Sequence, residues 1–65
     1  MNKALFSIHL IEDDDGLVTV VAEMVGRGDK CLDIGSEIMN NLHEAERGHP
    51  ELLNVTGIRA SQYFQ

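Results

Sequence analysis

Three consecutive aspartates followed by a glycine, Asp13-Asp14-Asp15-Gly16, are the residues of this chain that most suggest a metal site. Carboxylates close to a glycine are typical of calcium loops of the EF-hand type. Such loops place their ligands at alternate positions and end on a bidentate glutamate, whereas consecutive carboxylates point in diverging directions. We therefore expect no metal at these aspartates. They are predicted to form a solvated turn, or an acidic tip that binds a basic partner surface.

Three histidines and one cysteine, His9, His43, His49 and Cys31, are the other side chains with catalytic or ligand chemistry. His43 and His49 lack the i, i+4 spacing that brings two rings together on a helix. Cys31 lies in an apolar stripe, where a thiol is usually unreactive. Glycine loops that bind phosphate and serines in a hydrolase setting are also absent from the sequence. The sequence predicts no catalytic residue, no metal and no cofactor, which leaves a small enzyme only as the residual alternative.

A β-hairpin is the first element predicted around these residues, with strands over 4–12 and 17–25. A three-residue loop over 14–16 would pair Asp13 with Leu17 and gather the apolar residues of both strands on one face. A two-residue turn would instead set the apolar face of one strand against the mixed face of the other. The three-residue loop needs a left-handed residue at its end, which Gly16 supplies. The apolar face predicted to lie under a helix then contains Phe6, Ile8, Leu10, Val20, Ala22 and Met24.

The second face of the hairpin carries more apolar residues than a face exposed to water needs. We expect it to be an interface, with another copy of the chain as the expected occupant, although the exposed edge of the first strand could also join a second chain. His9 on this face could make the association pH-sensitive. The candidate interface residues are Leu5, His9, Ile11, Thr19, Val21 and Val25, together with Tyr63 and Phe64 from the end of the chain.

A helix is predicted after Gly26-Arg27-Gly28, beginning near Asp29 or Asp33, either of which could cap free backbone N–H groups. Gly48 is predicted as the left-handed residue after the helix, and Pro50 prevents its continuation. The stripe expected to pack on the hairpin, flanked by Ile34 and Met39, consists of Cys31, Gly35, Ile38, Leu42 and Ala45.

Residues 51–65 are predicted to add a third short strand, interrupted or ended at Gly57, with a short helical turn after Pro50 or a docked tail as the alternatives. The expected fold class is therefore α+β. It is a small ββα(β) domain, with an antiparallel hairpin, one packed helix and a third strand, and it forms a single domain over residues 1–65.

Size and charge limit the classes of partner. A chain of 65 residues is near the lower limit for a stable core, and the single Cys31 excludes an internal disulfide, so we expect a homo-oligomer, most simply a dimer. Five basic residues stand against eleven acidic ones, a formal net charge of −6. Because the basic residues are scattered, no direct contact with nucleic acid is expected. No apolar run spans a membrane and no signal peptide is evident, so a cytoplasmic location is expected.

The function expected from these features is that of a small acidic, non-enzymatic accessory protein. It would bind and modulate another macromolecule, as an inhibitor of phage or mobile-element type does in the host cytoplasm, and would act as a homo-oligomer. The alternative is an antitoxin-like or structural dimerisation module. The Asp15-Gly16 turn, Gly28-Asp29 and Glu44-Ala45 loosely resemble the partial HicB antitoxin domain over 4–47. The Pro-Gly loop and the tandem acidic helix start of that family are absent here, so the chain is not assigned to it.

Overall fold

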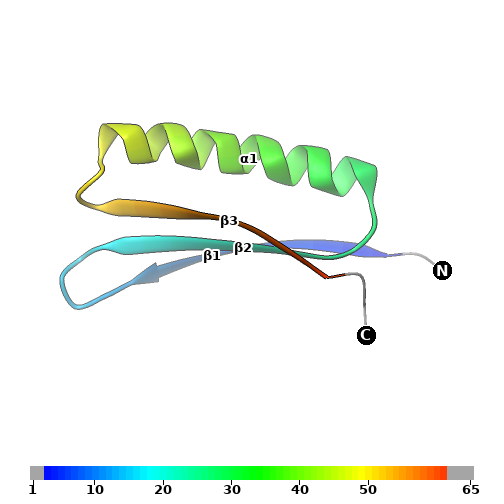
Figure 1. Ribbon diagram of the computed structural model, residues 1–65, viewed down its shortest axis with the longest axis horizontal. Helices are drawn as coiled ribbons and strands as arrows, with labels where there is room; N and C mark the ends of the chain where they lie inside the picture. The colour runs from blue at the N-terminus through cyan, green and yellow to red at the C-terminus, as the bar shows by residue number, and fades with distance from the viewer. Residues whose placement is uncertain (1–2, 62–65) are drawn as a thin grey trace.

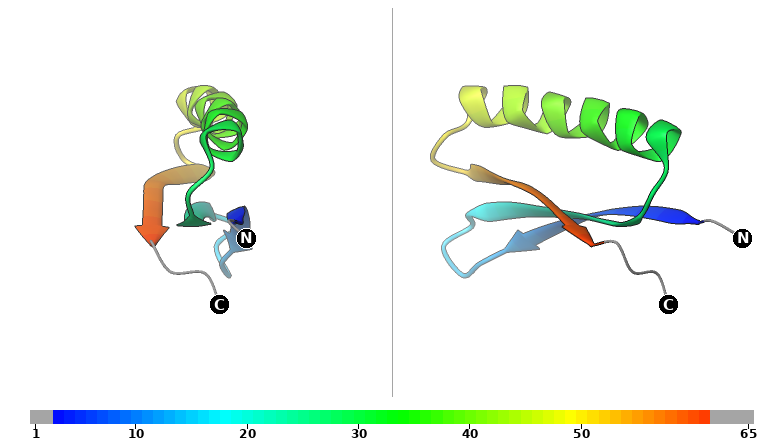
Figure 2. Two further views of the ribbon diagram at one scale, coloured as in Figure 1. Left: turned by 90° about the vertical axis from the view of Figure 1, so that its right-hand side faces the viewer. Right: turned by 45° about the vertical axis from the view of Figure 1, so that its right-hand side comes forward.

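The computed structural model describes residues 3–61, which form three strands and one helix. The elements follow the order β1 (Ala4–Glu12), β2 (Val18–Gly26), α1 (Asp29–Gly48) and β3 (Leu53–Ser61). The strands form one sheet in the order β1-β2-β3, antiparallel between β1 and β2 and parallel between β2 and β3. The helix lies against one face of this sheet (Figure 1, Figure 2). The α+β fold class predicted from the sequence is confirmed, and its third strand is β3.

The register of the hairpin is the one that its hydrophobic pattern predicts. Phe6 pairs with Met24, Ile8 with Ala22 and Leu10 with Val20. The N–H of Asp13 donates to the carbonyl of Leu17 at 3.0 Å, and Gly16 at the end of the loop has φ +85°. The loop is therefore the three-residue form with a left-handed glycine.

β3 continues past Gly57, so the prediction that the strand ends there was wrong, whereas an interruption of its pairing at this point is confirmed. Val20 pairs with Val55, but Ala22 pairs with Ile58, so the register with β2 shifts between these pairs. β3 has one more residue than β2 in this interval, as in a β-bulge. The hydroxyl of Thr56 donates to the carbonyl of Val20 at 2.8 Å and fills the gap that the extra residue leaves in the ladder.

The core lies between the central strand β2 and the helix. Val20 and Ala22 are fully buried, and Met24 is nearly so. Met39 of α1 and Val55 of β3 complete the buried set, and the residues packed around it are Phe6, Ile8, Leu42 and Leu53. A core of this size is small, which agrees with the general difficulty of stabilising chains of this length alone.

The helix packs with a different rotational phase from the predicted one. Met39, expected at the margin of the stripe, is 3% exposed, whereas Ile38, expected at its centre, is 44% exposed. Ala45 is also exposed, while Gly35 is buried beneath the ring of Phe6. The contact between Gly35 and Phe6 sets the face that the helix turns to the sheet, and Met39 lies one turn further along that face.

The helix begins at Asp29, one of the two predicted starts, but the capping at both of its ends differs from the prediction. The N-cap residue is Gly28, which has no side chain to accept a hydrogen bond, and Asp29 lies in the first turn. The negative charge of Asp29 there interacts favourably with the positive end of the helix dipole. At the other end Gly48 is the last helical residue and has no positive φ, and the N–H of His49 donates to the carbonyls of Ala45 and Glu46.

The helix crosses the sheet obliquely, and this leaves part of β1 uncovered. Its first turns lie over the start of β1, where a β-carbon on Gly28 would contact Ala4. Its last turns lie over β3, where the Glu46 carboxylate accepts from the N–H of Val55 at 2.8 Å. Leu10, near the end of β1, was predicted to lie under the helix and is 63% exposed. That prediction was wrong because the helix has left β1 before Leu10 is reached.

Candidate interaction surface

The sheet face opposite the helix is covered by no other element of residues 3–61 (Figure 2). We call it the open face. Side chains alternate between the two faces of a strand, so the odd-numbered positions of β1 and β2 share this face. Leu5 and Ile11 on it are 50% and 55% exposed, and Val21 and Val25 are half-buried.

The open face brings together six of the eight predicted interface residues. Across β1 and β2, Leu5 pairs with Val25, His9 with Val21 and Ile11 with Thr19. These pairs form a continuous surface with apolar groups at both ends and a more polar middle, where Val21 lies opposite His9. Tyr63 and Phe64, the other two predicted residues, lie outside the described residues.

The polar middle of the open face contains one acid and two bases. The carboxylate of Glu23 lies 3.6 Å from Nε2 of His9, with both side chains about half exposed. A pair this exposed contributes little to stability. Glu23 is also the register partner of Arg59 on β3. Arg59 was not among the predicted interface residues, because the face on which it lies depends on the irregular register of β3.

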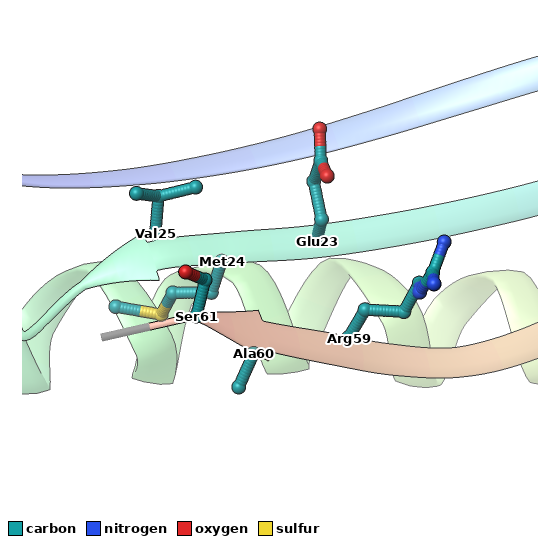
Figure 3. A pocket seen from close by; sticks show the side chains of 6 residues that line it. All are labelled: Glu23, Met24, Val25, Arg59, Ala60 and Ser61. Atoms are coloured by element: carbon teal, nitrogen blue, oxygen red, sulfur yellow. The ribbon is translucent and has the colours of Figure 1, made fainter. Parts of the chain in front are cut away.

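A shallow groove of about 350 Å³ runs between the ends of β2 and β3. In Figure 3 the side chains of Glu23 and Arg59 extend on the same side of the two strands, and Met24 lies toward the helix. The lining residues are Glu23, Met24, Val25, Arg59, Ala60 and Ser61. The groove is open and small, so it is a shallow depression in the surface and not an enclosed ligand site.

The three aspartates of the hairpin loop have different roles. Oδ1 of Asp13 accepts hydrogen bonds from the N–H groups of Asp15 and Leu17, at 2.9 and 3.0 Å. Asp13 therefore fixes the turn, while Asp14 and Asp15 extend their charges into solvent. Within residues 3–61, no three His, Cys, Asp or Glu side chains are grouped so that they could hold a metal ion.

The remaining candidate chemistry is dispersed along the helix. His43 lies 3.6 Å from Glu46, a half-buried pair one turn apart, and Cys31 is half-buried near the helix start. Twelve residues separate Cys31 from His43, about 18 Å along a helix, so the two side chains form no dyad. His49 lies beyond the helix end. The structure brings none of these groups together.

The fold and this surface define a class of protein, a three-stranded ββαβ domain with one covered and one open sheet face. Comparison with protein-family models, curated proteins and solved structures finds no match for the chain. Within the described part of the chain, α1 is not apolar over a length that would cross a bilayer.

Proposed function

We propose that this protein is a non-enzymatic, protein-binding accessory protein that acts as a homo-oligomer and modulates another macromolecule by occupying its surface. The single observation that carries the proposal is the open face. Leu5 and Ile11 are half exposed at its two ends, with Val25 opposite Leu5 and Val21 in the middle, on a sheet whose other face packs against α1. Burying apolar surface stabilises a complex by roughly 25 cal/mol per Å², and contiguous apolar patches mark interaction sites.

The charge distribution supports a protein as the modulated partner. Among residues 3–61, Glu23 is the only acidic side chain on the open face. The other carboxylates lie at the helix-side end of β1, in the hairpin loop, on the helix and in the turn after it. The open face can therefore approach a protein surface without strong repulsion, while Asp14 and Asp15 extend beyond it toward a basic patch. With a net charge of −6, the chain is poorly suited to phosphate backbones.

Small size and acidity support placing the protein with small acidic accessory proteins of phages and mobile elements. In that class it would act in the host cytoplasm as an inhibitor. An antitoxin-like or structural dimerisation module is the second candidate. It is favoured by the free edge of β1, which is suited to self-assembly.

The experiment is affinity capture of partners from the native host with matched variants. The wild type and Leu52→Glu, which changes an exposed apolar residue off the open face, should retain the same protein. Val21→Glu in the middle of the open face should lose it, and Leu5→Glu at its end should weaken it. Circular dichroism checks that each variant keeps its helix. Equal retention by all four proteins would contradict the proposal.

A further inference from the structure

The edge strand β1 exposes large apolar side chains on both of its faces. Leu5 and Ile11 lie on the open face, whereas Leu10 lies on the helix side and is the most exposed large apolar residue described. An occupant of the open face alone would leave Leu10 in water. A second chain at the edge of the sheet would cover Leu10 as well.

The backbone of this edge is free to pair. Because the N–H of Asp13 donates to Leu17 of the opposite strand, the odd-numbered residues of β1 direct their N–H and C=O groups toward β2. The even-numbered residues from Ala4 to Glu12 direct theirs outward. β1 contains no proline, glycine or register shift, whereas β3 has Gly57 and an irregular register. Natural edges are usually interrupted by such features, and β1 is not.

We propose that a second copy of this chain pairs antiparallel with β1 along this edge, about a two-fold axis through Ile8. The inference rests on the homo-oligomer of the proposed function and names the surface that forms it. Pairing the whole of β1 with itself sets Ile8 opposite Ile8, Leu10 opposite Phe6 and Ile11 opposite Leu5 of the second copy. The large apolar residues then oppose one another on both faces, while Ser7 stands opposite His9 and Ala4 opposite Glu12. Every outward N–H and C=O of the strand finds a partner.

Charge complementarity selects the same register. One step beyond the paired strands, Lys3 stands opposite Asp13 of the second copy, so opposite charges meet at both ends. Shifting the register by two residues in one direction sets Glu12 opposite Phe6, and the opposite shift sets Ile11 opposite Lys3. Both shifts bring a charge against a large apolar side chain. The centred register avoids both mismatches and sets Glu12 only against the small side chain of Ala4.

The resulting dimer has one continuous sheet of six strands, with both helices on the same side. Its two open faces merge into one surface, which stays available to the partner macromolecule. Self-association and partner binding share Leu5 and Ile11, which lie both in the paired strand and on the open face. Leu10 belongs to the dimer contact alone and Val21 to the open face alone, so variants at these positions can separate the two.

The first test is solution size by light scattering across a concentration series. The wild type should be a dimer at micromolar concentration, and Leu10→Lys should raise the dimer dissociation constant by about tenfold or more. Leu52→Lys, which makes the same charge change at an exposed apolar residue away from β1, should leave it unchanged. Val21→Glu should also remain dimeric. A monomeric wild type, or a Leu10→Lys variant that dimerises as well as the wild type, would overturn the edge contact.

The second test measures the register and does not depend on Leu10→Lys being folded. In a Cys31→Ser background, Leu5→Cys combined with Ile11→Cys places cysteines in a pair outside the hydrogen bonds, with Cα atoms about 4.5 Å apart and within disulfide reach. Within one copy these residues are about 20 Å apart along the strand. Mild oxidation should therefore yield a covalent dimer from the double variant only. No covalent dimer, or equal cross-linking of each single variant, would refute the register. Partner capture, measured separately, would still decide the proposed function.

Discussion

The ring of Phe6 on β1 lies so close to Gly35 of α1 that a β-carbon at residue 35 would stand 2.5 Å from the ring Cδ2 atom. Side chains do not tolerate that separation, so Gly35→Ala must move the ring or the helix. We expect it to lower the free energy of unfolding by about 1–3 kcal/mol, although alanine favours a helix by about 1 kcal/mol over glycine. Urea denaturation followed by circular dichroism measures the change.

Gly48→Ala is the matched control, because nothing lies within 4 Å of a β-carbon there and its φ is not positive. It should leave stability unchanged or raise it slightly. Combining Gly35→Ala with Phe6→Leu should recover part of the loss, since the smaller side chain makes room. An equal effect of both glycine substitutions would mean that Gly35 and Phe6 do not limit the approach of helix and sheet.

The second prediction concerns the rotational phase of the helix, in which Met39 is buried and Ile38 is exposed. Met39→Ala removes a buried side chain and should lower the free energy of unfolding by about 2–5 kcal/mol. Ile38→Ala, one residue away on the exposed flank, should change it by less than about 1 kcal/mol in the monomer. Denaturation at a concentration below dimer formation compares the two. A larger loss for Ile38→Ala would restore the phase expected from the sequence.

The hairpin could be predicted from the sequence because its determinants are local. A period-two pattern and the position of Gly16 admit one register that keeps the apolar residues on one face, and the structure has it. The helix phase could not be predicted in this way. Ile38 and Met39 are both apolar, so the choice between them depends on where Gly35 meets Phe6, which is a contact between distant parts of the chain.

The candidate site was also predictable only where it depends on the local pattern of the hairpin. The open face follows from the hairpin register, so Leu5, His9 and Val21 were placed on one face from the sequence. The place of Arg59 depends on the bulge in β3, and the exposure of Leu10 depends on the oblique path of the helix. Neither has a signature in the local sequence.

The hydrogen bond from the helix to β3 carries the third prediction. Oε2 of Glu46 accepts from the N–H of Val55, a buried residue, at 2.8 Å. Glu46→Ala leaves that N–H without its acceptor and should lower the free energy of unfolding by about 1–3 kcal/mol. Glu46→Gln keeps an oxygen acceptor and should lose less. Hydrogen exchange at the Val55 amide should accelerate in the alanine variant more than in the glutamine variant, and identical exchange in both would contradict this role.

Asp13 is the subject of the fourth prediction, since its carboxylate holds the hairpin loop through two backbone N–H groups. Asp13→Ala should lower the free energy of unfolding by about 0.5–2 kcal/mol, whereas Asp13→Asn retains a side-chain acceptor and should lose less. Asp14→Ala changes an exposed residue and serves as the control. Equal stability of Asp13→Ala and Asp14→Ala would show that the turn does not depend on this carboxylate.

The fifth prediction concerns the acidic tip of the hairpin loop. The tip consists of Asp14 and Asp15, because the carboxylate of Asp13 is hydrogen-bonded within the turn. If the tip attracts a basic partner surface, Asp14→Asn combined with Asp15→Asn should weaken capture of the partner, and the difference should be greatest at low salt, where screening is weakest. Asp29→Asn combined with Asp33→Asn makes the same change of charge on the helix and should leave capture nearly unaffected. Binding measured over a salt series separates the two pairs. If both pairs weaken capture equally, net charge alone governs the association; if neither does, the aspartates of the tip serve only the turn and solubility.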